Sequence, residues 1–179
     1  MANYNSCGSA VTLNSIDSRC DNSIGGIKRI LIANVADVQK VTVDETTGMI
    51  NAITMVASKK FQQWLFRRNT GSYTSTVSSD PTIGNTSVTT EVSLQFSKAE
   101  AQKRLEIQSA INATAILIVE DMYGQFIYLG YDNEVAITSA VMQSGTQNSD
   151  LSGFTLTFQD ISSELPHFVD PAIINDIVA

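Results

Sequence analysis

The stretch 67-RRNTGSYTSTVSSDPTIGNTSVTTEVSLQF-96 decides how the fold is interpreted, because it begins as a polar run and ends as a strand. Residues 69–86 consist mostly of Ser, Thr, Gly and Asn, which predicts a long loop. A loop of this length is uncommon inside a domain and is usually functional or disordered. We therefore interpret residues 69–86 as the tip of an extended hairpin that is mobile in the isolated chain and orders against a partner. The following residues alternate with polar ones, as in a half-buried strand: Val88, Thr90, Val92, Leu94 and Phe96.

Before and after this strand, runs of β-branched and aromatic residues predict further strands. A turn at residues 44–48 ends in Gly48, a residue that adopts a positive φ without strain. The expected count is six to eight strands, mostly joined as hairpins. This pattern predicts a mainly β fold, an antiparallel β-sandwich or small barrel with one flanking α-helix and a long hairpin loop. The segments from which these strands are expected to form are residues 27–35, 40–43, 49–56, 61–68, 88–96, 113–121, 125–131, 134–145 and 152–162, nine segments in all.

The flanking helix is expected at residues 98–112, directly after the decisive strand. Ser97 and Glu100 have the spacing of a capping box, which marks a helix start. The apolar side of this helix is narrow, formed by Ala101, Leu105 and Ile111, with Ile107 towards its edge. We expect the helix to lie on a sheet with Leu105 against the core. The residues predicted to form that core are Val92, Leu94, Phe96, Phe154, Leu156 and Phe158.

The domain organisation is one β domain with two appendages. Residues 1–25 are rich in Asn, Ser, Asp and Gly and are interpreted as an N-terminal arm, and residues 26–179 as the domain. The C-terminal tail, residues 163–179, is expected to form a short helix or an extension docked on a neighbour. The two cysteines, Cys7 and Cys20, have neither zinc nor redox-motif spacing, so two reduced thiols are expected.

Charge is distributed unevenly along a chain whose net charge is −7. Residues 1–68 hold eight Lys/Arg and five Asp/Glu, whereas residues 69–179 hold three and thirteen. Because no cluster of basic residues exceeds a pair, the sequence argues against general nucleic-acid binding through a basic patch. Two interpretations stay open: an acidic, solvated exterior, or an assembly in which acidic residues meet a basic neighbour or line a passage for an anion. The sequence shows no apolar run long enough for a membrane span and no signal-peptide pattern.

No group of residues has the pattern of a catalytic or metal site. His167, the only histidine, lies between Pro166 and Phe168, which is typical of packing. Glu120 and Asp121 are adjacent on a strand and therefore face opposite sides, so they are interpreted as a pair at a turn that faces solvent. We expect no enzymatic activity, no cofactor and no metal.

The order of the predicted elements and several sequence segments in the second half of the chain resemble one protein family. The capped helix "SKAEAQKRLEIQSAI" (97–111), the strands "AILIVED" (115–121) and "QFIYLGY" (125–131), and the late run "SGFTLTFQDISSELPHFVD" (152–170) carry the resemblance. They are similar to virion proteins of tailed bacteriophages with the tail-tube fold. These include tail tube proteins and related neck or ring proteins of phages infecting Bacteroidetes, crAss-like phages among them. The N-terminal arm has no counterpart in this pattern.

The resemblance implies a ring of identical copies, six- or twelvefold, in the tail or neck of a virion, made in the cytoplasm of a bacterial host. Neighbouring tail or neck proteins are the other implied partners, DNA passes through as a non-specific cargo, and no membrane is involved. The residues expected at contacts between copies are Arg67, Arg68, Tyr73, Pro81, Ile83, Phe168, Ile173 and Ile174. The residues expected to line the channel are Glu120, Asp121, Asp132 and Glu134. A capsid decoration protein and a surface or carbohydrate-binding β module are the alternatives.

Overall fold

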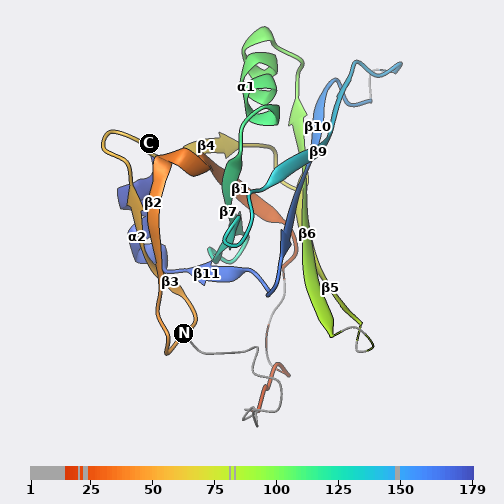
Figure 1. Ribbon diagram of the computed structural model, residues 1–179. Coiled ribbons are helices and arrows are strands. Elements are labelled where there is room, and N and C mark those ends of the chain that lie inside the picture. The colour runs from red at the N-terminus through yellow and green to blue at the C-terminus, as the bar shows by residue number, and fades with distance from the viewer. Residues whose placement is uncertain (1–14, 20, 22–23, 81, 83, 148–149) are drawn as a thin grey trace.

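A computed structural model describes residues 15–19, 21, 24–80, 82, 84–147 and 150–179, which form two β-sheets and two α-helices (Figure 1). This confirms the predicted mainly β sandwich with a flanking helix. A seven-stranded sheet has the order β2-β3-β11-β8-β7-β1-β4, and a four-stranded sheet has the order β5-β6-β10-β9. The elements are β1 (Ile27–Asn34), a short 3-10 turn (Val35–Asp37), β2 (Val38–Val43), β3 (Ile50–Met55), β4 (Gln62–Leu65), β5 (Gly71–Asp80), β6 (Asn85–Ser97), α1 (Ala101–Ile111), β7 (Ala115–Asp121), β8 (Phe126–Leu129), β9 (Ala136–Gln143), β10 (Gly153–Ser162), β11 (His167–Val169) and α2 (Pro171–Ile177).

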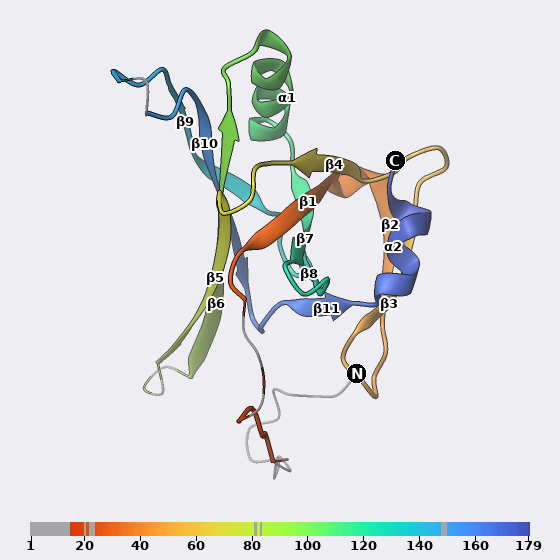
Figure 2. The same cartoon turned by 180° about the vertical axis from the view of Figure 1, so that it is seen from behind.

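The seven-stranded sheet is strongly curved, and the four-stranded sheet lies against its convex side (Figure 2). Strands β1 and β7 are neighbours inside the seven-stranded sheet and are largely buried on both faces, which explains why their sequences are nearly continuous apolar runs. On β1, Ile30 and Ile32 face the core between the two sheets, whereas Leu31 and Ala33 face a second core. The second core is enclosed by the curved sheet and α2.

The first core contains the residues predicted from the alternating strands. Val92 and Leu94 on β6 and Phe154, Leu156 and Phe158 on β10 are buried in it, and Phe96 is half-buried against it. The register explains the contact, since Leu94 lies across from Leu156 and Val92 across from Phe158. This part of the prediction is confirmed.

The predicted extended hairpin is present, but the prediction of a loop over residues 69–86 is wrong, because most of these residues form strands of the hairpin. Residues of β5 pair with β6 over ten positions, from Gly71 opposite Leu94 to Asp80 opposite Asn85. The resulting hairpin projects well beyond the rest of the molecule (Figure 1). The polar composition reflects an exposed edge strand, and its threonines supply the β-branched preference for extended backbone. Together with β11, this strand raises the number of strands in the described chain to eleven, above the expected six to eight.

The helix α1 also differs from its prediction. Ser97 is the last residue of β6, paired with Gly153, and Lys98 has a φ of 67°, so the capping box does not form and the helix begins at Ala101. Ile107 is the buried residue of α1, whereas Leu105 is 60% exposed on the opposite side of the helix. The expected contact of Leu105 with the core is therefore wrong.

The C-terminal tail forms β11 and α2. Asp170 caps α2 by accepting a hydrogen bond from the Ala172 amide at 2.9 Å, and Pro171 occupies the first turn, where its missing N–H costs nothing. β11 joins the two halves of the seven-stranded sheet, pairing with β8 on one side and with β3 on the other. No helix in the described part of the chain has the length and apolar character needed to cross a membrane.

Candidate assembly surface

The four-stranded sheet ends in two edge strands, β5 and β9. β5 pairs with β6, and β9 pairs with β10, and within the described residues no strand covers their outer edges. An uncovered edge exposes a row of backbone N–H and C=O groups that can pair with another chain. The hairpin of β5 and β6 and the end of β9 and β10 project in opposite directions (Figure 1), so these edges extend past the body of the molecule.

The face of this sheet that points away from the first core is covered by small polar side chains. Because side chains alternate along a strand, this face follows from the register with the buried positions. It contains two exposed carboxylates, Glu91 near its middle and Asp80 at the far end of β5. Glu91 accepts a hydrogen bond from the Gln159 amide at 3.3 Å. Besides Asp80, Glu91 and Gln159, the side chains of this outward face are those of Ser72, Thr74, Thr76, Ser78, Asn85, Ser87, Thr89, Ser93, Gln95, Ser97, Ala136, Ser139, Val141, Gln143, Thr155, Thr157 and Ile161.

None of the four strands contains a Lys or an Arg. A phosphate backbone is held in proteins mainly by these two side chains, whose binding releases counterions. The outward face therefore offers hydroxyl and amide groups and a small negative charge, and no cation that would hold DNA. Among the described residues, no group of three or more His, Cys, Asp and Glu side chains is arranged to hold a metal ion.

Apolar side chains of both edge strands are left exposed on the inward side. Tyr73 and Val77 lie opposite Val92 and Val88 on β6 and continue the inward row of that strand. On β9, Met142 lies opposite Phe154 and is also exposed. Burial raises the pKa of the Tyr73 hydroxyl, and the Asp121 carboxylate adds to the shift. The inward-facing apolar side chains therefore continue into exposed positions on both edge strands of the four-stranded sheet.

The four residues expected to line a channel lie elsewhere. Glu120 is only 3% exposed and forms ion pairs with Lys28 and Arg29 on β1, so the interpretation that it faces solvent is wrong. Asp121 closes the β7–β8 turn by accepting hydrogen bonds from the Tyr123 and Gln125 amides, both at 2.8 Å.

Asp132 and Glu134 belong to the connection between β8 and β9, which is outside the four-stranded sheet. Hydrogen bonds from the Ser163 side chain and amide hold the pKa of Asp132 below its usual range. Glu134 is exposed. The structure therefore does not place these carboxylates on the polar face of the sheet.

The residues expected at contacts between copies are spread over the molecule. Arg67 and Arg68 are exposed in the connection between β4 and β5, and Tyr73 lies on the exposed hairpin. Phe168 on β11 is also exposed. Pro81 and Ile83 lie outside the described residues, as do Cys7 and Cys20.

In the tail, Ile173 is half-buried and Ile174 is buried in the second core of its own chain. The side chain of Ile174 is therefore not available to a neighbouring copy, and this expectation is wrong. His167 is half-buried, with Nε2 3.1 Å from Glu164 Oε1 and Nδ1 3.0 Å from the Gly48 carbonyl oxygen.

Sequence reasoning missed the outward face because its strand β5 was interpreted as a loop. The signal was present in the repeated Thr residues and in the spacing of Tyr73, Ser75 and Val77, which point to the same side of the strand. It also missed the partners of Glu120, since Lys28 and Arg29 lie about ninety positions earlier in the chain.

The chain matches no family model, and no curated protein matches it. A chain in a solved structure titled "Virion of native gene transfer agent (GTA) particle" aligns with 77% of this chain and 99% of its own length. The two are 12% identical and superpose with a TM-score of 0.34. A likeness this distant carries no weight for the fold or the function of this chain.

Proposed function

We propose that this chain is a structural virion protein of a tailed phage, which assembles with identical copies into a ring or tube around a channel for DNA. The observation that carries the proposal is the four-stranded sheet with two uncovered edges and a polar face free of Lys and Arg. The sequence resemblance to tail-tube and neck-ring proteins supplies the class and the expected six or twelve copies. The role is structural and involves no reaction.

In this proposal, β9 of one copy pairs with β5 of the next. Such pairing satisfies both edges at once, and repeating it around a ring leaves no edge uncovered. In the register of one sheet Tyr73 on β5 is level with Ile137 on β9, so the pairing brings these two inward side chains together and joins the inward rows of the two copies into one apolar layer. Burying such side chains contributes about 25 cal/mol per Å² of apolar surface.

The outward face then lines the channel. Passing DNA meets hydroxyl and amide groups with scattered carboxylates such as Glu91, a surface that repels phosphate weakly and does not hold it. The channel-lining residues proposed here replace Glu120, Asp121, Asp132 and Glu134.

The test is negative-stain electron microscopy of the concentrated, purified chain, together with sedimentation. Rings or tubes are expected for the wild type. The variant Met142→Lys with Val141→Lys places two charges at the exposed β9 edge and is expected to abolish the assembly while preserving the monomer fold, since both side chains are exposed. A matched control is Leu165→Lys, which adds charge at an exposed apolar position in the connection between β10 and β11.

A wild type that stays monomeric at high concentration excludes self-assembly. In that case, binding to assembled capsids supports a decoration protein, and binding of the monomer to glycans supports a carbohydrate-binding module.

A further inference from the structure

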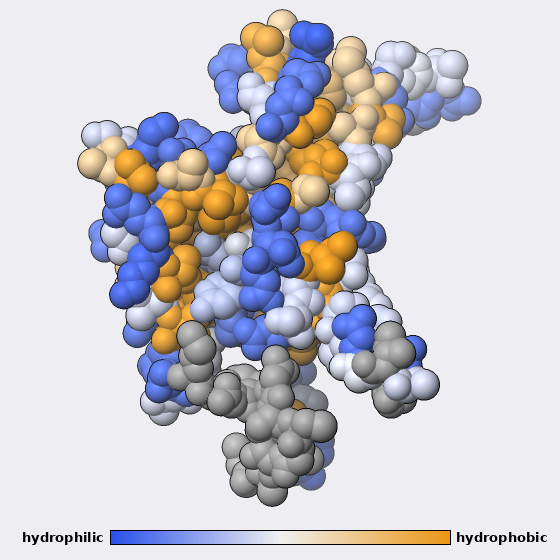
Figure 3. All heavy atoms as spheres, viewed as in Figure 1, coloured by the Kyte–Doolittle hydropathy of each residue, from blue (hydrophilic) through white to orange (hydrophobic). Residues whose placement is uncertain are grey.

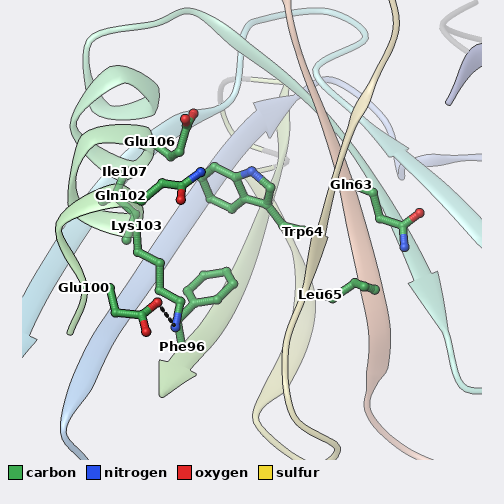
Figure 4. A pocket seen from close by; sticks show the side chains of 9 residues that line it. All are labelled: Gln63, Trp64, Leu65, Phe96, Glu100, Gln102, Lys103, Glu106 and Ile107. Atoms are coloured by element: carbon green, nitrogen blue, oxygen red, sulfur yellow. Dashed lines mark ion pairs between the residues drawn. The ribbon is translucent and has the colours of Figure 1, made fainter. Parts of the chain in front are cut away.

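A groove of about 300 Å³ lies between α1 and β4, at the end of the molecule where the helix stands (Figure 4). The Trp64 indole points towards α1 and packs edge-on against Phe96, with 5.6 Å between the ring centroids. Ile107 of α1 contributes to the apolar floor. The rim carries amides and charges, with Gln102 and Glu106 of α1 on the same side as the indole. We call this the α1–β4 groove; its remaining lining residues are Gln63, Leu65, Glu100 and Lys103.

The hollow continues along the helix. A second depression of about 370 Å³ shares Trp64 and Glu106 with the α1–β4 groove and extends to Ala110 and Lys59. The cause is the weak attachment of α1, whose buried contact with the body is Ile107. Apolar side chains reach the surface below α1 (Figure 3). The surface beside α1 is therefore hollowed on both sides of Trp64.

The floor of the groove is also the free edge of the seven-stranded sheet. β4 is the last strand in the order of that sheet and pairs with β1, through Ile30 opposite Trp64. In the described chain no strand pairs with the outer edge of β4 itself, and Phe61, directly before it, forms a parallel bridge with Val178. A free edge beside an apolar pocket is the arrangement that binds an extended peptide, because the backbone pairs with the strand and side chains fill the pocket.

A segment suited to such a site precedes β1. In the described part of the N-terminal arm, Ile16 is 95% exposed and Ile24 is 50% exposed, so the chain's own body does not bury them. The sequence before Ile16 also contains two apolar residues, Val11 and Leu13, at a spacing of two. The other arm residues in this region are mostly small and polar, and their side chains match an amide-containing rim.

The positions of arm and groove favour contact between copies over contact within one chain. The described arm residues leave β1 at the end of the molecule opposite α1, as both views show (Figures 1 and 2). At about 3.3 Å per extended residue, residues 11–26 span up to roughly 50 Å, enough to reach the facing end of another molecule.

We propose that the N-terminal arm of one copy, through residues 11–24, docks in the α1–β4 groove of a second copy that faces it end to end. The proposal rests on the self-assembly proposed above and adds a contact along the stacking direction. Ring closure through β5 and β9 uses a different surface, so the two contacts are independent.

Trp64 provides a direct readout, because it is the only tryptophan in the chain. A synthetic peptide of residues 9–26, with serine in place of Cys20, is added to the full chain at a concentration where the chain is monomeric. Docking is expected to produce a saturable shift of the Trp64 emission to shorter wavelength, because the peptide excludes water from the indole.

The matched control peptide carries Leu13→Asp and Ile16→Asp and is expected to bind about tenfold or more weakly, since a buried aliphatic side chain is replaced by a charged one at two positions. The absence of any shift with the natural peptide, or an equal shift with both peptides, overturns the docking proposal. This readout does not require rings or tubes.

Crosslinking tests the contact in the assembly itself. Both partners carry Cys7→Ser and Cys20→Ser; one also carries Ile16→Cys, the other Gln102→Cys. A disulfide-linked dimer is expected when the two are mixed and oxidised, and less of it when Leu165→Cys replaces Gln102→Cys. If rings form without this crosslink, the self-assembly proposal stands and the docking of the arm is contradicted. If the Trp64 emission shifts but no rings form, the docking proposal is supported and the proposed function is contradicted.

Discussion

Arg29 on β1 and Glu120 on β7 are direct cross-strand partners, and their side chains form an ion pair at the edge of the second core. Lys28 donates a second hydrogen bond to the Glu120 carboxylate at 2.7 Å. The Arg29 side chain is 22% exposed and that of Lys28 is 61% exposed. Burial alone raises the pKa of Glu120, but the bonds from Lys28 and Arg29 outweigh it and hold the pKa below its usual range.

The first prediction concerns the loss of these partners. Arg29→Ala is expected to reduce the free energy of unfolding by about 3 kcal/mol, because it leaves a buried carboxylate with one partner. Lys28→Ala, the matched control, is expected to cost less than about 1 kcal/mol, since that side chain reaches solvent. Urea unfolding of the monomer measures both. Equal costs for the two variants contradict the assignment of Arg29 as the principal partner.

The pH dependence of the same site follows from the lowered pKa of Glu120. The ionised carboxylate contributes stability above its ordinary pKa, about 4.3, and this contribution is lost as the pH falls through the lower pKa of the folded state. We expect the stability difference between wild type and Glu120→Gln to shrink on acidification below about pH 4. A difference that is constant from neutral to acid pH argues against an ionised Glu120.

Asp160 is expected to behave in the opposite way. Its side chain lies on the inward side of β10, 2% exposed, and within the described chain Oδ1 has no hydrogen-bond partner. Burial raises the pKa of Asp160. The folded chain therefore favours the protonated acid, and stability decreases as the pH rises from about 4 through the raised pKa.

Asp160→Asn removes this titration. Relative to the variant, the wild type is expected to lose stability between acid and neutral pH, as measured by thermal unfolding at a series of pH values. The sign of the slope is the criterion, because the amide introduces its own buried donors and shifts the whole curve by a constant. A wild type that gains stability relative to the variant over this range contradicts the prediction.

The next prediction tests the core between the sheets. Leu156→Ala is expected to reduce the free energy of unfolding by about 2–5 kcal/mol, since it leaves a cavity between the two sheets at a fully buried position. Leu105→Ala is the matched control on α1, where the side chain is mostly exposed, and is expected to cost less than about 0.5 kcal/mol. Denaturant unfolding of both variants under the same conditions gives the comparison. A cost below about 1 kcal/mol for Leu156→Ala is inconsistent with a core position.

The last prediction concerns the charge of the outward face. If this face lines a DNA channel, Glu91→Lys with Gln95→Lys is expected to leave folding intact, because both side chains are exposed, and to make assembled tubes retain DNA. The retention should weaken steeply with salt, since it depends on counterion release. The measurement is DNA co-sedimentation with tubes at low and high salt. Glu134→Lys, which lies outside the sheet, is the control, and equal retention by both variants argues against this face as the channel wall.

The fold class and most of the first core could be predicted from the sequence. The reason is local: alternating apolar residues such as Leu94 and Leu156 specify a strand and its buried face without information from elsewhere in the chain. The hypothesis of a tail-tube protein also depends on the local order of predicted elements, from the helix after residue 97 to the run that ends at Asp170.

The tertiary structure was needed to show which polar segments form strands and which charged side chains form buried ion pairs. β5 forms because β6 offers ten residues to pair with, and its composition alone resembles a loop. Glu120 is buried because Lys28 and Arg29 compensate its charge from a distant strand. Ile107 is the inward residue of α1 in place of Leu105, because the packing of the whole helix on the body sets which side is buried. Pairing across long separations depends on the complete fold, and a single strand's sequence does not encode its neighbours.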